Sequence, residues 1–300
     1  MDRRQFIKGS AAGAVGIAGT INAGLFAAEP ISRHSGHKFK YSLAAYSYRQ
    51  LLGGDLKSLS LHEFIDDCAS MGLEGTELTS YYFPTEVTPE YLNSLKQHAF
   101  KLGVDVSGTA VGNDFGYAED DPKRQEQIDH VKTWVKHAQI LNAPVIRIFA
   151  GHQKAGVDES KTHKLMVSAI EECCDFAGKH GVYLALENHG GPTSTAEGLM
   201  KFVNDVQSPW FGVNLDTGNF SSDDVYAEME QVAPYAVNVQ VKVAVRGPDK
   251  VKKPSDFNRL RQILENSGYR GYVVLEYEEG GEPREESRRW MLELREAIGG

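Results

Sequence analysis

Four short apolar stretches of this sequence end in side chains that carry oxygen ligands. They span residues 182–191 (VYLALENHGG), 211–216 (FGVNLD), 237–242 (VNVQVK) and 272–276 (YVVLE). Short apolar runs rich in β-branched residues are typical of buried parallel strands. At or near the ends of these runs stand Glu187, Asp216, Gln240 and Glu276. A buried polar group is costly unless something binds it, so we expect these four side chains to converge on one divalent cation.

Oxygen donors of this kind predict a hard cation and the chemistry that it supports. We expect Mn²⁺ first, with Mg²⁺, Co²⁺ or Zn²⁺ as alternatives. Such a cation can bind the carbonyl and a neighbouring hydroxyl of a sugar, and it stabilises the enediolate that forms when the carbon between them loses a proton. The proton transfer also needs a base on the correct face of the sugar. We expect Glu187 and Glu276 to form the catalytic pair, one removing the proton and the other returning it.

The elements that position these residues alternate regularly between strand and helix. Strands are expected at residues 40–46, 75–78, 104–111, 144–149, 182–186, 210–215, 237–243 and 272–277, with helices between them that include residues 193–206, 255–266 and 285–298. Eight such units predict an α/β fold of the closed (βα)8 TIM-barrel type. The alternative is an open doubly wound sheet, but no G-x-G-x-x-G motif follows the first strand. In a barrel the active site lies at the C-terminal ends of the strands, where all four candidate ligands fall.

The first residues have the composition of an export signal. Arg3 and Arg4 form a twin-arginine pair, and the stretch from Ala11 to Ala28 carries no charge. This layout is typical of a signal peptide of the Tat pathway; a short amphipathic or disordered N-terminus is the alternative. We expect a signal peptide at residues 1–28, a linker at 29–38, a single barrel domain at 39–300 and a periplasmic location. No later stretch is long and apolar enough to span a membrane.

The net charge argues against one class of partner, and the cysteine spacing argues against a thiolate metal site. The formal net charge is −9 and basic residues form no cluster, so nucleic acid is not an expected partner. The cysteines are Cys68, Cys173 and Cys174, and none of them belongs to a C-x-x-C motif. We therefore expect them to pack in the core as small apolar residues.

The motifs at the strand ends resemble the sugar phosphate isomerase/epimerase family, whose members have a xylose-isomerase-like barrel. The resemblance covers essentially the whole chain after the leader and rests on LENHGG (186–191), LDTGN (215–219), VQVK (239–242), LEYE (275–278) and GTEL (75–78). It implies metal ligation by Glu187, Asp216, Gln240 and Glu276, acid/base roles for the two glutamates, and a homo-oligomer of two or four chains.

Two positions depart from the pattern of that family. Gln240 stands where a metal-binding histidine is usual, and Asn219 stands where a histidine is often found. An amide oxygen is a weaker ligand than an imidazole, so the metal site is expected to select hard ions, to be weak, or to be lost. The multi-histidine zinc cluster of endonuclease IV, a DNA-repair member of the same group, is not evident.

Six further side chains are candidate substrate contacts: His189, Lys242, Glu77, Asn219, His152 and Arg246. His189 lies on the face of Glu187 by strand alternation, and it either binds a substrate hydroxyl or packs under the glycine turn. A lysine inside a buried strand is rarely structural, so Lys242 is expected to contact the substrate or its oxyanion. Glu77 either contacts the substrate or braces the barrel mouth.

The remaining candidates lie in loops or at strand ends. His152 and Arg246 belong to loops expected at the mouth, where each either binds substrate or is merely solvated. Tyr46 and Trp210 either form an apolar wall against which a sugar stacks or pack in the core.

These observations predict a metal-dependent sugar isomerase or epimerase that acts on a small carbohydrate by proton abstraction next to a carbonyl. One alternative is a lyase or hydratase acting on 3-keto sugars or keto-glycosides, in which the same metal and base are used but a β-leaving group is expelled. A second alternative is a non-catalytic sugar-binding barrel, for which Gln240 is the reason. No Gly-rich phosphate loop is evident, so a phosphorylated substrate is not specifically indicated.

Overall fold

The computed structural model describes residues 28–33, 36–53, 58–154 and 158–299. The predicted signal peptide therefore lies outside the described residues except for Ala28. Within the described part of the chain, no helix combines the length and the apolar character needed to cross a lipid bilayer.

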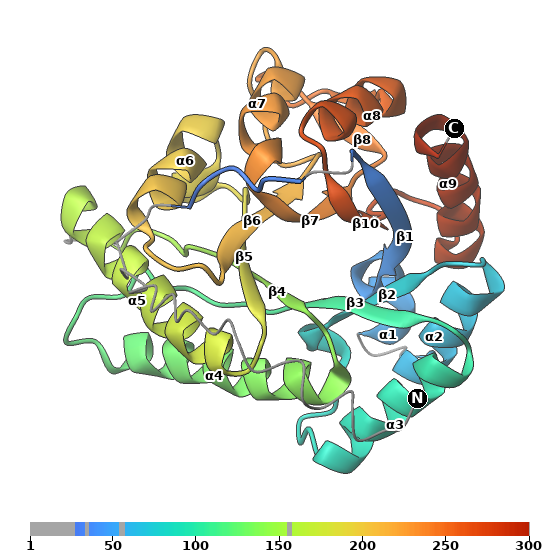
Figure 1. Cartoon of the computed structure of the whole chain (residues 1–300), viewed down its shortest axis with the longest axis horizontal. Helices are drawn as coiled ribbons and strands as arrows, with labels where there is room; N and C mark the ends of the chain where they lie inside the picture. The colour runs from blue at the N-terminus through green and yellow to red at the C-terminus, as the bar shows by residue number, and fades with distance from the viewer. Residues whose placement is uncertain (1–27, 34–35, 54–57, 155–157, 300) are drawn as a thin grey trace, which may run out of the picture.

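Eight parallel strands close into a barrel (Figure 1). In order around the barrel they are β1 (Lys38–Ala44), β10 (Arg270–Leu275), β7 (Ala236–Val241), β6 (Phe211–Asp216), β5 (Tyr183–Glu187), β4 (Val145–Ile148), β3 (Asp105–Ala110) and β2 (Gly75–Thr79). Strand β1 closes the ring because it pairs with β10 on one side and with β2 on the other. The (βα)8 TIM-barrel fold predicted from the sequence is confirmed.

A ring of helices covers the outside of the barrel (Figure 1). Its members are α2 (Leu61–Ser70), α3 (Pro89–Lys101), α4 (Pro122–Leu141), α5 (Glu159–Lys179), α6 (Ala196–Asp205), α7 (Val225–Val232), α8 (Phe257–Asn266) and α9 (Pro283–Ile298). The shorter elements are α1 (Arg49–Leu52), the 3₁₀ turns η1 (Ala45–Tyr48), η2 (Ser80–Tyr82), η3 (Gly191–Thr193) and η4 (Ala233–Tyr235), and the strands β8 (Ala244–Arg246) and β9 (Lys252–Pro254). Strands β8 and β9 form an antiparallel hairpin between β7 and α8 that the sequence analysis did not predict.

Three helices begin at positions that differ from those predicted, and side-chain caps explain why. Helix α6 begins at Ala196 because Thr195 caps it, its side chain accepting a hydrogen bond from the N–H of Gly198. Asp256 and Glu282 cap α8 and α9 in the same way. A cap residue satisfies backbone donors that have no partner inside the helix, so its position fixes the first turn.

Ala28, the last residue of the predicted signal peptide, and residues 29–33 of the predicted linker pack across the end of the barrel at which the strands begin. The N–H of Ala28 donates to the carbonyl of Val203 at 3.1 Å, and the guanidinium of Arg33 donates to the carbonyl of Ala236 at 2.8 Å. Trp210 precedes β6 at this same end and stacks against Tyr183, with 5.1 Å between ring centroids. The interpretation of Trp210 as part of a sugar-binding wall is therefore wrong, because the active-site mouth is at the opposite end.

The three cysteines are buried and unpaired, as predicted. Cys68 lies in α2, and the other two lie in α5 on the side that faces the barrel. They contribute to the continuous apolar layer between the strands and the ring of helices.

Candidate active site

Three carboxylates lie buried at the C-terminal ends of neighbouring strands. Glu187 and Asp216 are the last residues of β5 and β6, and Glu276 directly follows β10. Their exposed fractions are 4%, 0% and 7%. Asn188 ties the first two strand ends together, because its side chain donates to the backbone carbonyl of Asp216 at 2.8 Å and accepts from its N–H at 2.9 Å. The structure thus brings these three predicted residues to one place.

Glu187 is held by two partners that define its orientation. The Nε of Arg147 lies 2.8 Å from one carboxylate oxygen, and the side-chain amide of Asn219 donates to the other at 2.8 Å. Arg147 is itself buried, with its guanidinium stacked on the ring of Phe149 at 4.0 Å and donating to the carbonyl of Val111 at 2.7 Å. The predicted residue Asn219 therefore contacts the predicted base directly.

The ammonium of Lys242 lies among the carboxylates. Its Nζ is 2.7 Å from Glu276, 3.0 Å from Glu278 and 3.3 Å from Asp216. Gly218 makes room for this side chain, because a Cβ at residue 218 would lie 2.5 Å from the Cγ of Lys242. The glycine of the LDTGN motif is therefore required for the lysine to reach the cluster.

Gln240 makes its contacts deeper in the barrel than Lys242. Its amide nitrogen donates to Glu77 at 2.6 Å and its amide oxygen accepts from Asn214 at 2.7 Å. Asn238 completes the group by donating to Glu77 at 2.9 Å and to Asn214 at 2.8 Å. Glu77 therefore braces the interior of the barrel through Gln240 and Asn238.

Negative charge exceeds positive charge in this buried region. Four carboxylates are buried there, on Glu77, Glu187, Asp216 and Glu276, and only the two cations Arg147 and Lys242 are buried with them, which leaves two negative charges among the described residues unbalanced.

Burial raises the pKa of Asp216 to about 7, against the opposing effect of Lys242. Burial also raises the pKa of Glu77 to about 7, and Glu276 adds to this shift. The pKa of Glu187 is raised well above its usual value by burial, with Asp216 and Glu276 adding to the rise and Arg147 opposing it. Burial would lower the pKa of Lys242, but the surrounding carboxylates raise it overall. Carboxylates tuned toward neutral pH are typical of functional sites.

The donor set fits a hard divalent cation by its chemistry. Glu187, Asp216 and Glu276 supply carboxylates and Gln240 supplies an amide oxygen, which suit Mn²⁺ or Mg²⁺. The Oδ2 of Asp216 is fully buried, and within the described residues its partner is the Lys242 ammonium at 3.3 Å, in an ion pair without hydrogen-bond geometry. Within the same residues, however, no three acidic, histidine or cysteine side chains are already spaced as a metal shell; the Lys242 ammonium lies between Asp216 and Glu276 instead.

The other predicted substrate contacts lie around the mouth. His189 is exposed and stacks on Phe149 at 4.4 Å between ring centroids, and with His152 it lines a cavity of about 70 Å³. Arg246 is half-buried at the end of β8. Across the described ranges, neither His152 nor Arg246 contacts the carboxylates. Tyr46 lies in η1 at the mouth, edge-on to Tyr81 at 6.3 Å.

Sequence reasoning missed Arg147 and Arg49. Arg147 interrupts the apolar run VIRIF in β4, and a charge inside a buried strand was the signal that identified Lys242. Arg49 donates to the backbone carbonyls of Tyr277 and Glu278 at 2.9 and 2.8 Å, which holds the segment after β10 in place. That role involves backbone carbonyls 228 residues or more away, so nothing in the local sequence indicates it.

Two mouth loops are packed together without space for a side chain. Gly151 has a φ of +101°, and a Cβ there would lie 2.2 Å from the Oδ1 of Asp114. We predict that Gly151→Ala lowers the free energy of unfolding by at least about 1–3 kcal/mol. The backbone strain of a positive φ and the steric overlap of the new Cβ both contribute. Gly181→Ala is the matched control, because Gly181 has a φ of +69° but its Cβ would meet nothing within 4 Å. Urea denaturation measures the stability of both variants. Equal destabilisation of the two would contradict the packing argument.

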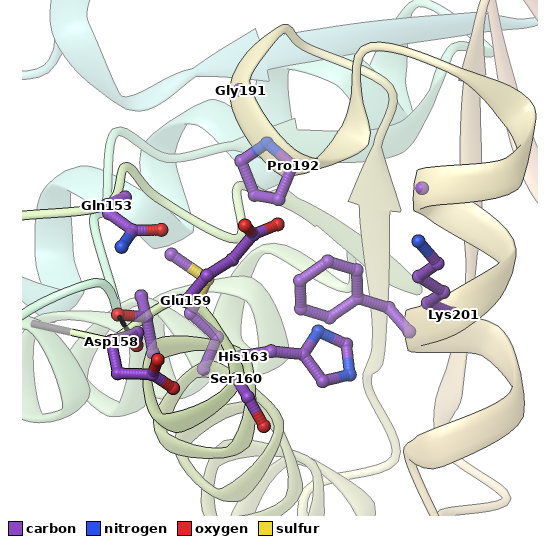
Figure 2. Close-up of a pocket in the computed structure, with 12 residues that line it drawn as sticks. Gln153, Asp158, Glu159, Ser160, His163, Gly191, Pro192 and Lys201 are labelled. Carbon is purple, nitrogen blue, oxygen red and sulfur yellow. Dashed lines mark hydrogen bonds between the residues drawn. The ribbon is translucent and has the colours of Figure 1, made fainter.

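A larger cavity lies beside the mouth and does not include the carboxylates. Its volume is about 750 Å³, and it lies between the start of α5 and the helix α6. Figure 2 shows Asp158, Glu159 and His163 on one side and Lys201 on the other, with Pro192 above. Its lining includes none of the buried carboxylates Glu187, Asp216 and Glu276, and it does not include Lys242. We therefore do not assign the reaction to this cavity.

Comparisons with known proteins agree with this architecture. The sequence model of the family described as xylose isomerase-like TIM barrel matches residues 65–294. L-ribulose-5-phosphate 3-epimerase UlaE of Escherichia coli (strain K12 / DH10B) is 25% identical over 166 residues, which cover 53% of this chain and 58% of that protein. The chain thus matches little more than half the length of this curated relative.

Solved structures share the fold at lower sequence identity. D-psicose 3-epimerase from Clostridium cellulolyticum H10 superposes with a TM-score of 0.71 at 18% identity, covering 86% of this chain and 99% of that one. The probable 3-DHS dehydratase AsbF of Bacillus anthracis superposes with a TM-score of 0.63 at 18% identity, covering 85% and 98%. One barrel architecture therefore accompanies both an epimerase and a dehydratase.

Proposed function

We propose that this chain, which belongs to the xylose isomerase-like TIM barrel family, is a divalent-metal-dependent sugar isomerase or epimerase. Its substrate would be a small keto sugar, and its reaction would be proton transfer at the carbon next to the carbonyl. The epimerase relative supports this class of reaction. Its place would be the periplasm, a proposal supported by the twin-arginine motif at Arg3 and Arg4.

The observation that carries this proposal is the pair of buried carboxylates, each with its own cation. Glu187 is paired with Arg147 and Glu276 with Lys242, on strands β5 and β10 that are separated by β6 and β7 in the barrel. Epimerisation needs one group to take a proton from one face of a carbon and a second group to deliver a proton to the other face. Two carboxylates on different strands meet that need.

The surrounding residues prepare the pair for proton transfer. Arg147 and Asn219 fix both oxygens of Glu187, so the carboxylate has little freedom to rotate away from the substrate. Burial also raises the pKa of Glu187 well above its usual value, which makes its carboxylate a stronger base than an exposed glutamate.

The proposed metal ligands are Glu187, Asp216, Gln240 and Glu276, and Mn²⁺ is the first choice of ion. When bound, the cation supplies Lewis-acid stabilisation of the negative charge that develops on the carbonyl oxygen. Lys242 contacts two of these carboxylates, so its ammonium must withdraw toward Glu278 when a cation enters.

Lys242→Met tests this competition between ammonium and metal. We predict that the variant binds Mn²⁺ more tightly, by roughly tenfold or more, which is the size of effect that a neighbouring charge has on a proton equilibrium. The metal-free variant should also unfold at a lower temperature, because it leaves buried carboxylates without a counter-charge. Isothermal titration calorimetry with MnCl₂ measures the affinity, and an unchanged or weaker affinity would contradict the prediction.

A lyase that acts on 3-keto sugars or keto-glycosides remains the second candidate, because the same base and metal would serve β-elimination. The dehydratase among the structural neighbours shares the fold. Incubating the Mn²⁺-loaded protein with free keto sugars and with aryl 3-keto-glycosides separates the two. Epimers recovered from intact sugars support the proposal, whereas release of the aryl alcohol without epimerisation would replace it by the lyase.

A further inference from the structure

Thr79 ends strand β2 at the mouth of the barrel, and its hydroxyl group is buried without a hydrogen bond. The side chain is 1% exposed, and its Oγ1 has no partner within the described residues. Thr79 is also the N-cap residue of the 3₁₀ turn η2, a position at which threonine commonly accepts a hydrogen bond from a backbone N–H. Among the residues that the structure describes, its side chain makes no such cap bond. Native proteins leave few buried polar groups unsatisfied, so this hydroxyl points to a contact with a ligand.

The register of the strands places the hydroxyl inside the barrel. Glu77, two residues before Thr79, points into the interior, where amide side chains of β7 donate to its carboxylate. Side chains alternate along a strand, so Thr79 shares this inward face. Thr79 is also paired with Ala110 of β3, and Ala110 is paired with Arg147 of β4. Thr79 therefore belongs to the same row of inward side chains as Arg147, the ion-pair partner of Glu187.

Small side chains line the part of the mouth to which Thr79 belongs. Strands β1, β2 and β3 end in Ala44, Thr79 and Ala110. The remaining strands of the barrel carry long charged side chains at or beside their ends, on Arg147, Glu187, Asp216, Lys242 and Glu276. A substrate that contacts the two glutamates thus meets less side-chain bulk on the side of β1 to β3. Of the three small residues there, Thr79 alone has a side chain that can form a hydrogen bond.

We infer that Thr79 is a substrate-binding residue that determines specificity: its hydroxyl forms a hydrogen bond with a hydroxyl of the keto sugar bound beside Glu187 and Glu276. A hydroxyl both donates and accepts, so it can pair with a sugar hydroxyl in either sense. The inference rests on the proposed conversion of a keto sugar, and it is independent of the metal ion. It predicts that a sugar without the matching hydroxyl is bound less tightly.

Thr79→Val tests the inference, because valine keeps the branched shape and removes only the hydroxyl. The substrate would be the free ketohexose or ketopentose that the wild-type protein converts fastest. Its KM should rise by about 10-fold, the upper end for an uncharged hydrogen bond, because the Thr79 hydroxyl is already shielded from solvent. The turnover number should stay within about twofold, since the bond is present in both the bound substrate and the transition state. The variant should melt no lower than the wild type, because it loses an unpaired buried hydroxyl.

Thr109→Val is the matched control. Thr109 is also 1% exposed, and its Oγ1 also lacks a hydrogen bond across the described ranges. Its pairing with Leu78 and Ile146 places it on the outward face of β3, in the apolar layer between strands and helices. This variant should change the melting temperature in the same way as Thr79→Val and should keep the wild-type KM.

Two further comparisons make the assignment specific. Thr79→Ser keeps the hydroxyl and should keep KM near the wild-type value; if Thr79→Val does not fold, Thr79→Ala compared with Thr79→Ser gives the same test. Monodeoxy analogues of the converted sugar identify the group that is contacted. The analogue without that hydroxyl should give equal KM values for the wild type and Thr79→Val, because the coupling between the two groups is then absent.

The outcomes separate the inference from the proposed function. An unchanged KM in folded Thr79→Val, or an equal rise in KM in Thr79→Val and Thr109→Val, would overturn the inference and leave the proposed function in place. A lower melting temperature of Thr79→Val with wild-type KM would show that the hydroxyl is bonded within the protein, which also overturns it. Failure of the wild-type protein to convert any sugar of the panel would overturn both together.

Discussion

Replacing Glu187 by Gln is expected to lower the turnover number of the enzyme by about 10²- to 10⁴-fold, the usual contribution of a general base. The change removes the proton acceptor and one proposed metal ligand at once. It preserves the size of the side chain. The loss should therefore appear in kcat as well as in kcat/KM. Initial rates of epimerisation, measured on the keto sugar that the wild-type protein converts, give both constants.

A matched variant separates this effect from a general loss of charge. Glu172→Gln removes a surface ion pair with Lys132 on the outer helices, and such pairs contribute little, so its rates should equal those of the wild type. A Glu187→Gln variant that kept more than a tenth of the wild-type turnover would exclude Glu187 as the base. If the wild-type protein and Glu187→Gln bound sugar equally well and neither turned it over, a non-catalytic sugar-binding barrel would be favoured.

Arg147→Met is expected to have the largest effect on stability. Arg147 is 6% exposed and its Nε lies 2.8 Å from Glu187. Methionine retains much of the apolar contact with Phe149 but leaves the carboxylate buried without its cation. Breaking a buried ion pair from one side costs about 3–5 kcal/mol, so urea denaturation should show a loss of that size in the free energy of unfolding.

The double variant Arg147→Met with Glu187→Gln tests the reason for that loss. Removing the carboxylate charge as well should recover part of the stability, because no uncompensated charge then remains in the interior. A double variant less stable than Arg147→Met alone would mean that Arg147 stabilises the barrel through packing rather than through its charge. If Arg147→Met lost less than about 1 kcal/mol in the free energy of unfolding, the Arg147–Glu187 ion pair would stabilise the protein no more than an exposed ion pair does.

The barrel and its site differ in how far the sequence predicts them. Eight apolar runs that alternate with helices predicted the fold. Four of them end in oxygen-bearing residues, and this predicted the place where Glu187, Asp216 and Glu276 meet, because parallel strands in a barrel all end at the same mouth. A lysine inside a buried strand also predicted that Lys242 belongs to the site, and its ammonium does lie among the carboxylates. The same argument applied to Arg147 would have found the partner of Glu187.

The partners of Gln240 could not be predicted in the same way. Its contacts depend on the register between β6 and β7, and that register shifts between Val213 and Asn214. A one-residue shift changes which side chains face each other across two strands, and no local pattern reports it. Of the two alternatives for Trp210, packing is the one that the structure supports. Its place at the start of the expected strand 210–215 already put it at the end of the barrel opposite the mouth.

Incorporation of solvent deuterium tests the central claim most directly. The protein without residues 1–28, loaded with Mn²⁺, would be incubated with a panel of keto sugars in D₂O, and the recovered sugars would be analysed by mass spectrometry and NMR. Proton abstraction next to the carbonyl predicts one deuterium per turnover, located at the epimerised carbon of an intact sugar and lost in Glu187→Gln. Epimers formed without deuterium at that carbon, in a site that exchanges protons with solvent, would contradict the proposed mechanism.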